Sequence, residues 1–202
     1  MKPGPPGASL LGVCSILPSG GEMSRTSLCA IALGAALLSG QAFAIPLNNT
    51  AFDCQVASQM GRSDPATLRL CNRAVQTEGL TDEQRAATHL NRGVVYIARG
   101  SERLAIADFE EAVRLNPALA EAHVNLGLAR LATLDYAAAA ASLTTGLTLG
   151  PREPAKAYYG RGLAYEALSR LPEAREDFQR AASLAPNWAD PRNDLARVAA
   201  AN

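Results

Sequence analysis

Apolar positions recur along the chain with the period of an amphipathic helix, and the same outline returns three times. The stretch IADFEEAVRLNP (106–117) carries its apolar residues at helical spacing and ends at a proline. Comparable stretches end at Pro151 and Pro186. Because proline removes a backbone donor and clashes with the preceding turn, each stretch predicts a helix that stops at a fixed place in a repeated unit.

Three residue types mark this repeat. Glycine lies in the first predicted helix of each unit, alanine in the second, and proline closes the second: Gly93, Gly127 and Gly162; Ala105, Ala139 and Ala174; Pro117, Pro151 and Pro186. Successive members of each set are 34 and then 35 residues apart. A fixed period of this length is typical of supersecondary units stacked in series.

The second helix of each unit has one stripe of matched residues. A bulky residue follows the alanine by four positions and a small one follows three later: Phe109, Leu143 and Phe178, then Ala112, Gly146 and Ala181. Spacings of four and three share one helical face, so this stripe is predicted to be buried. Tyr96 and Tyr165 lie three residues after their glycines and are expected on the same seam, where the middle unit has Arg130.

Helix starts are also readable. Thr81 followed by Gln84 three residues later predicts a capping box. Ser101 and Asp135 are expected to cap second helices, and Pro172 suits the first turn of another. These signals agree with the helix-turn-helix spacing of the repeat.

Glycine, tyrosine, alanine, phenylalanine, alanine and proline at these offsets resemble the tetratricopeptide repeat. The first unit matches with Gly93, Tyr96, Ala105, Phe109, Ala112 and Pro117. The resemblance implies an all-α fold, a right-handed superhelix of stacked antiparallel helix pairs. The region of three repeats is placed at 81–186, and the individual units are placed at about 86–119, 120–153 and 155–188. Residues 187–202 resemble the helix that commonly closes such arrays. A generic repeat of helical hairpins is the alternative interpretation.

A weaker helix pair is predicted upstream, in residues 45–80. LCNRAVQTEGL echoes FEEAVRLNPAL, which aligns Cys71 with Phe109. In this register Cys54 falls near the glycine-equivalent position of the first helix and faces Cys71. Cys54 and Cys71 are the only cysteines after residue 44, where we expect a secretory signal to end. An even pair of cysteines in an exported protein favours a disulfide, which predicts a cross-linked N-terminal pair. Two free, buried cysteines remain the alternative.

The segment 23–44 has the three parts of a secretory signal. Arg25 lies in a short positive region, 28–38 is apolar, and Ala42 to Ala44 form a cleavage site. Residues 1–22 do not resemble a signal, so we expect that Met23 is the true start and that 1–22 is a misassigned leader. Because the apolar run is too short to span a bilayer, we expect the mature chain to be exported to the periplasm with no membrane span. A retained anchor is the alternative.

Composition and charge narrow the function classes. With 19 basic and 19 acidic residues and no dense block of either sign, the chain lacks the charge pattern of a nucleic-acid binder. No nucleophile-base pattern or phosphate loop is present, and the repeat accounts for most of the sequence, so neither an enzyme nor a cofactor is predicted. His89 and His123 are one period apart, too far to share a metal ion, and are expected to be packing residues.

The resemblance further implies that first helices line a concave groove for a protein or peptide partner. The positions carried over to this chain are Leu90, Asn91, Val94, Ile97, Glu121, Val124, Asn125, Leu128, Leu131, Lys156, Tyr159, Leu163 and Glu166. Most are apolar, so an apolar or amphipathic partner segment is expected. These positions could instead be core, or be covered by 45–52.

Some family members bind a C-terminal carboxylate with lysine, asparagine and arginine side chains. Only Asn125 and Lys156 match that cluster, whereas Leu90, Val94 and Gly160 occupy its other places. The sequence therefore disfavours carboxylate binding. It predicts a non-enzymatic protein-interaction module of the bacterial cell envelope, the alternative being a structural protein whose apolar face forms a homo-oligomer.

Overall fold

The computed structural model describes residues 50–77 and 79–200, and the predicted leader and signal lie outside them. Regular structure in these residues is entirely helical, which confirms the predicted fold class. The helices are α2 (Thr50–Gln59), α3 (Pro65–Val75), α4 (Asp82–Ala98), α5 (Glu102–Leu115), α6 (Ala120–Ala132), α7 (Tyr136–Leu149), α8 (Pro154–Ala167), α9 (Leu171–Leu184) and α10 (Ala189–Ala200). Across this part of the chain, no helix combines the length and apolarity that crossing a bilayer requires.

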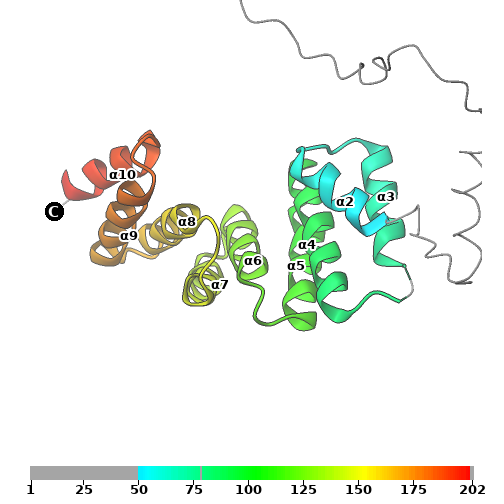
Figure 1. Cartoon of the computed structure of the whole chain (residues 1–202). Helices are drawn as coiled ribbons and strands as arrows, with labels where there is room; N and C mark the ends of the chain where they lie inside the picture. The colour runs from blue at the N-terminus through cyan, green and yellow to red at the C-terminus, as the bar shows by residue number, and fades with distance from the viewer. Residues whose placement is uncertain (1–49, 78, 201–202) are drawn as a thin grey trace, which may run out of the picture. The chain divides into compact units, whose positions relative to one another are not determined.

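The helices stack as antiparallel pairs in chain order. Figure 1 shows α2 and α3 at one end, then the pairs α4/α5, α6/α7 and α8/α9, and α10 at the other end. Each pair packs on the next, and the first helices α2, α4, α6 and α8 also contact one another in succession. Each helix pair therefore buries its apolar face on its neighbours, as a solenoid requires.

Most of the predicted helix starts are confirmed. The Thr81 hydroxyl accepts from the backbone N–H of Gln84, whose side chain accepts from the Thr81 N–H in return. Asp135 caps α7, and Pro172 lies in the first turn of α9. Ser101 occupies the predicted N-cap position of α5, but its side chain accepts no hydrogen bond from the helix.

Glycine in each first helix touches the bulky residue of the second helix. A Cβ atom on Gly93 would lie 2.4 Å from the ring of Phe109, and one on Gly127 would lie 2.5 Å from Leu143. The equivalent distance from Gly162 to Phe178 is 2.7 Å. Since real Cβ atoms essentially never come within 3.0 Å of such atoms, the close pairing of these helices needs glycine at this position.

The buried interior consists of several local clusters. Alanines of the second helices, Ala105, Ala139 and Ala174, are fully buried, as are the bulky residues four positions later. Tyr96 and Tyr165 lie partly buried on the seam as predicted. The closing prolines Pro117, Pro151 and Pro186 all lie beyond helix ends, where they are not fully buried.

The turn between the helices of each unit repeats a left-handed residue. Gly100, Leu134 and Ser169 occupy equivalent positions with φ of 69°, 66° and 60°. Glycine adopts this conformation without steric cost, whereas a leucine Cβ crowds the backbone there. Leu134 is also 68% exposed, so the middle unit keeps a strained residue that contributes little packing.

Arginines of the first helices link each unit to the one before it. Arg92 on α4 donates to both carboxylate oxygens of Asp108 on α5, at 2.7 and 2.8 Å, and to Asn72 on α3. Arg161 on α8 binds Asp177 on α9 in the same way. Both carboxylates are almost fully buried, so losing the arginine would leave an unpaired buried charge, at a cost of about 3 kcal/mol.

The middle unit makes the same link from a different residue. Leu126 and Ser142 replace the arginine and the aspartate, and Arg130 at the tyrosine position donates to Ser142 instead. Arg130 also binds the preceding unit, as its counterparts do, and the three acceptors stand at equivalent positions: Asn72, Glu110 and Thr144. The substitution of tyrosine by Arg130 thus preserves a polar contact between stacked units.

A disulfide joins the N-terminal pair. The sulfur atoms of Cys54 on α2 and Cys71 on α3 are 2.09 Å apart, and both residues are fully inaccessible to solvent. They pack with Ala74 and with Val95 of α4. Because the fully buried members of this cluster are no larger than valine, the cross-link is expected to stabilise the pair substantially.

Replacing Gly93 with alanine tests the close contact. Helix propensity alone would make this change stabilising by up to about 1 kcal/mol. The clash with Phe109 should reverse the sign and lower the free energy of unfolding by about 2 kcal/mol. Urea denaturation followed by circular dichroism measures the change, and a gain in stability would contradict the packing.

Leu134→Gly should stabilise the protein. Glycine removes the strain of the left-handed backbone at this position, but it also makes the unfolded chain more flexible, which opposes the gain. The net effect is expected to add about 0.5–1 kcal/mol to the free energy of unfolding. The reciprocal change, Gly100→Leu, should destabilise by about 1–2 kcal/mol. Thermal and urea denaturation of both variants measure this; equal effects of the same sign would refute the strain.

The disulfide can be tested by mass. Without reductant, the intact protein should be lighter than the reduced form by two hydrogen atoms. The Cys71→Ser variant should unfold at a lower urea concentration, because its free energy of unfolding should fall by roughly 3 kcal/mol for a loop of this size. Two alkylatable thiols in the denatured, unreduced protein would exclude the cross-link.

Candidate partner-binding groove

Three hollows lie in a row between successive first helices. The central hollow, between α4 and α6 with α5 beneath, has a volume of about 200 Å³. Its lining is mainly apolar: Val94, Ile97, Glu102, Phe109, Asn125, Leu128, Ala129 and Ala132. A hollow with apolar walls and few polar groups suits an apolar side chain of a ligand.

The other two hollows extend the row in both directions. The N-terminal hollow, between α2 and α4, is lined by Ala51, Phe52, Gln55, Leu80, Gln84, Ala87, Thr88 and Asn91. The C-terminal hollow, between α6 and α8, is lined by Glu121, Val124, Asn125, Leu128, Pro151, Arg152, Glu153 and Lys156. It shares Asn125 and Leu128 with the central hollow, so the two are continuous along α6.

Two asparagines occupy the same place in successive first helices. Asn91 on α4 and Asn125 on α6 are one period apart and partly exposed, and each lines a hollow. Neither side-chain amide has a hydrogen-bond partner within residues 50–77 and 79–200. A side-chain amide offers both a donor and an acceptor, so the pair can bind two peptide groups of an extended chain.

Several predicted groove positions are interior. Val124 is 7% exposed and packs with Leu143 and Ala157. Leu131 packs on the small residues of α7 and α8, and Leu90 packs on the cluster around Phe109. Leu90 and Leu131 line none of the three hollows, whereas Val124 is almost fully buried and still contributes to the wall of the C-terminal hollow.

The third unit is covered by α10. Tyr159 donates its hydroxyl to Asp194 at 2.8 Å, and Trp188 packs edge-on against its ring. Leu163 joins the cluster around Phe178 and Val198, which also includes Tyr159. Glu166 pairs with Arg197 of α10, so the predicted residues Tyr159, Leu163 and Glu166 do not line the three hollows.

The pKa values follow this burial. Desolvation, together with the hydrogen bond to Asp194, raises the pKa of the Tyr159 phenol well above its usual value. At Asp108, burial would raise the pKa of the carboxyl, but hydrogen bonds from Arg92 and His89 outweigh it and lower the pKa. Asp108 therefore stays ionised and paired.

The two histidines bind protein groups rather than each other. His89 Nδ1 lies 2.9 Å from a carboxylate oxygen of Asp108, and His123 Nε2 lies 2.9 Å from the Pro117 carbonyl. Each ring therefore has a hydrogen-bonding partner within the protein. Among the described side chains, no three of histidine, cysteine or acidic type are placed to hold a metal ion.

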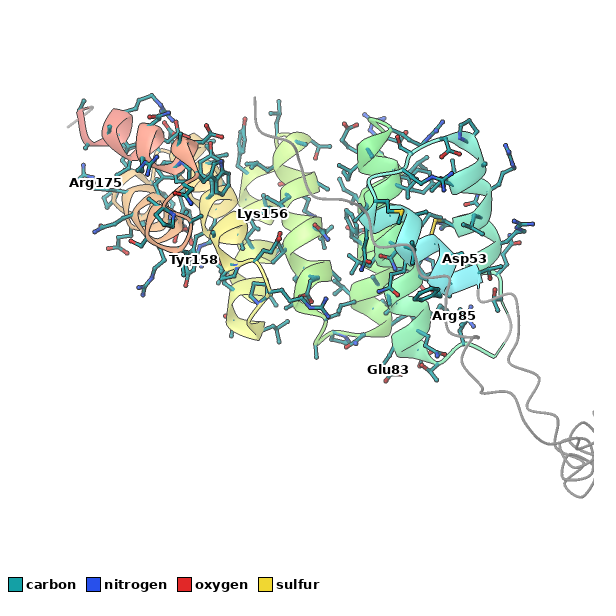
Figure 2. The ribbon with its side chains drawn as sticks, turned by 45° about the horizontal axis from the view of Figure 1, so that its top comes forward. Asp53, Glu83, Arg85, Lys156, Tyr158 and Arg175 are labelled. Carbon is teal, nitrogen blue, oxygen red and sulfur yellow. A yellow bond between two sulfur atoms is a disulfide. The ribbon has the colours of Figure 1, made fainter. Side chains whose placement is uncertain are left out.

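Cations in the C-terminal hollow are already paired. Arg152 donates its backbone N–H to Glu121 at 3.3 Å, with its side chain at 3.7 Å from the same carboxylate. Lys156, labelled in Figure 2 on α8, lies 2.5 Å from Glu153. Gly160 stands at a position that the carboxylate-binding members of the family use. The side chain of Leu128 occupies the space beside it, because a Cβ atom added to Gly160 would lie 2.6 Å from Leu128.

Sequence reasoning missed part of the lining. Glu102, Ala129 and Ala132 were not among the predicted groove residues, and neither were Arg152 and Glu153 of the loop before α8. The alanines open the central hollow because they are small, and small residues carry no signal of a binding surface. Glu102 belongs to the start of a second helix, where an acidic residue is common for electrostatic reasons.

Stacked helix pairs with a row of hollows between their first helices define a helical-repeat solenoid. Residues 155–187 match the family model described as tetratricopeptide repeat, and residues 93–133 match the one described as TPR repeat. The chain thus contains tetratricopeptide repeats in these two segments.

Two curated relatives share this repeat region. A "Lipoprotein NlpI homolog" of Haemophilus influenzae is 28% identical over 152 residues, covering 75% of this chain and 48% of the relative. "RNA polymerase II-associated protein 3" of Homo sapiens is 28% identical over 120 residues, covering 59% of this chain and 18% of the relative. The chain thus spans less than half the length of either protein.

Solved structures agree on the fold. "First TPR of Spaghetti (RPAP3) bound to HSP90 peptide SRMEEVD" matches with a TM-score of 0.56 and 28% identity, covering 59% of this chain and 97% of that one. "MamA 41-end from Desulfovibrio magneticus RS-1" matches with a TM-score of 0.63 and 23% identity, covering 75% and 84%. The second likeness is one of fold alone.

Proposed function

We propose that the protein is a non-enzymatic interaction module that binds an apolar or amphipathic segment of a partner along its first helices. The row of three hollows between α2, α4, α6 and α8 carries this proposal. The bound segment lies extended, with a side chain in the central hollow. Asn91 and Asn125 bind its backbone.

The comparisons support peptide binding. The RPAP3 structure, which matches 59% of this chain, is bound to an HSP90 peptide. The hollows of this chain combine apolar walls with two side-chain amides that have no hydrogen-bond partner in the described part of the chain, and an extended peptide needs this chemistry. The proposed contacts to the bound peptide are therefore polar along its backbone and apolar at the one side chain that enters the central hollow.

The proposed location is the bacterial cell envelope. The Haemophilus relative is named a lipoprotein, and residues 23–44 of this chain have the pattern of a secretory signal. The fully buried cysteine pair also suits an oxidising compartment. The partner would be another protein exposed in that compartment.

A homo-oligomer is the second candidate. A further hollow lies along α2 and α3 and is lined by Phe52, Asp53, Val56, Ala57, Met60, Arg62, Ala66, Thr67, Leu70 and Arg73. In the later units the corresponding face is covered by the preceding helix pair; Val95, for example, packs on the cysteine cluster. A second copy of the chain would cover the exposed Met60 in the same way.

Substitutions in the central hollow test partner binding. Ile97→Asp and Asn125→Ala should each reduce crosslinking to the partner in cells by at least about tenfold, since an anchor contributes about 2 kcal/mol and 1.4 kcal/mol is a factor of ten. Ile97 is 40% exposed, so the helices should remain folded by circular dichroism. Val124 is a poorer choice because it is buried.

Leu184→Asp is the matched control. Leu184 is 49% exposed and lines none of the three hollows. Unchanged capture by the two groove variants would exclude partner binding in the groove.

Light scattering on the same samples separates partner binding from self-assembly, because a dimer that Met60→Asp dissociates would favour self-assembly instead.

A further inference from the structure

The charged groups that line the three hollows are paired, with one exception. Glu121 is paired with Arg152, and Glu153 with Lys156. The N-terminal hollow is lined by no charged residue. Glu102, in the central hollow, forms no ion pair with any residue in 50–77 or 79–200. It leaves the row of hollows with one uncompensated negative charge.

Glu102 lies beside apolar walls. It is half-buried in the first turn of α5, and it shares the central hollow with Val94, Ile97 and Leu128. Apolar surroundings reduce the screening of a charge, so a cation placed there would be attracted more strongly than at an open surface. Its place in the first turn of α5 also suits a negative charge, because the N-terminus of a helix carries partial positive charge.

A terminal carboxylate does not suit these hollows. The cations that line them, Arg152 and Lys156, already face Glu121 and Glu153. Glu102 would repel an acidic group next to the apolar anchor. The charges therefore favour a segment from within a partner chain, with positive residues near the anchor.

We propose that the central hollow binds an apolar side chain flanked by lysine or arginine, from an internal segment of the partner. This inference rests on the proposed function and adds the charge and the position of the segment. The apolar side chain lies against Ile97 and Leu128. The neighbouring cation pairs with Glu102, and the backbone binds Asn125.

Selection from a library of random peptides tests this preference. One library displays the peptides internally and a second displays them with a free C-terminus. Phage from both are selected on the immobilised full-length mature protein, and the enrichment of each peptide is compared with its enrichment on an Ile97→Asp variant. Internal sequences with an apolar residue next to lysine or arginine should be enriched. Synthetic peptides of the selected sequence should lose about three- to tenfold in affinity when the basic residues are replaced by glutamate.

Charge reversal at Glu102 makes the test specific. Glu102→Lys should change the selected neighbours from basic to acidic, and Glu102→Gln should remove the preference while the apolar residue is retained. Glu83→Lys is the matched control, because Glu83 also lies in the first turn of a helix (Figure 2) but lines no hollow. It should leave the selected sequences unchanged.

The failures of the two proposals differ. Groove-dependent peptides with acidic neighbours or with an essential C-terminal carboxylate would overturn the charge assignment and leave groove binding intact. A basic preference that Glu102→Lys does not change would also overturn it. If no peptide is enriched over the Ile97→Asp variant, groove binding itself fails.

Discussion

The contact between a glycine and a bulky side chain determines how closely the helices of each unit pack. Gly93 meets Phe109, Gly127 meets Leu143 and Gly162 meets Phe178, and each pair is too close for any Cβ atom. Fully buried alanines surround these contacts. The short distance between first and second helix fixes the shape of the unit, and repetition of the unit determines how its first helices line up. The row of hollows is a consequence of that spacing.

Polar contacts complement this apolar packing at the stacked interfaces. Arg92 and Arg161 neutralise buried aspartates within their own units and reach a polar residue in the preceding unit. In the middle unit Arg130 makes the equivalent contact from one turn further along the helix. A buried ion pair contributes little net stability, but breaking it is costly, so these pairs favour one stacking register over others.

The groove depends on where neighbouring side chains leave space. Ala129 and Ala132 are too small to fill the gap between α4 and α6, which opens the central hollow. Leu128 fills the gap at Gly160, and α10 covers Tyr159 in the third unit. Equivalent positions of a regular repeat thus have different roles. An apolar residue of a first helix can be core, groove wall or cap contact according to its neighbours.

The sequence by itself determined the period, the helices and most of their caps, because these follow from local spacing. Thr81 and Gln84 lie within one turn, and Phe109 lies four residues from Ala105. Only the tertiary structure decided which first-helix residues are open. Three features depend on side chains from different helices: the pairing of Arg92 with Asp108, the lack of an ion pair for Glu102 among the described residues, and the covering of Tyr159 by α10. Their sizes and distances are set by packing, and no periodic pattern along one helix records them.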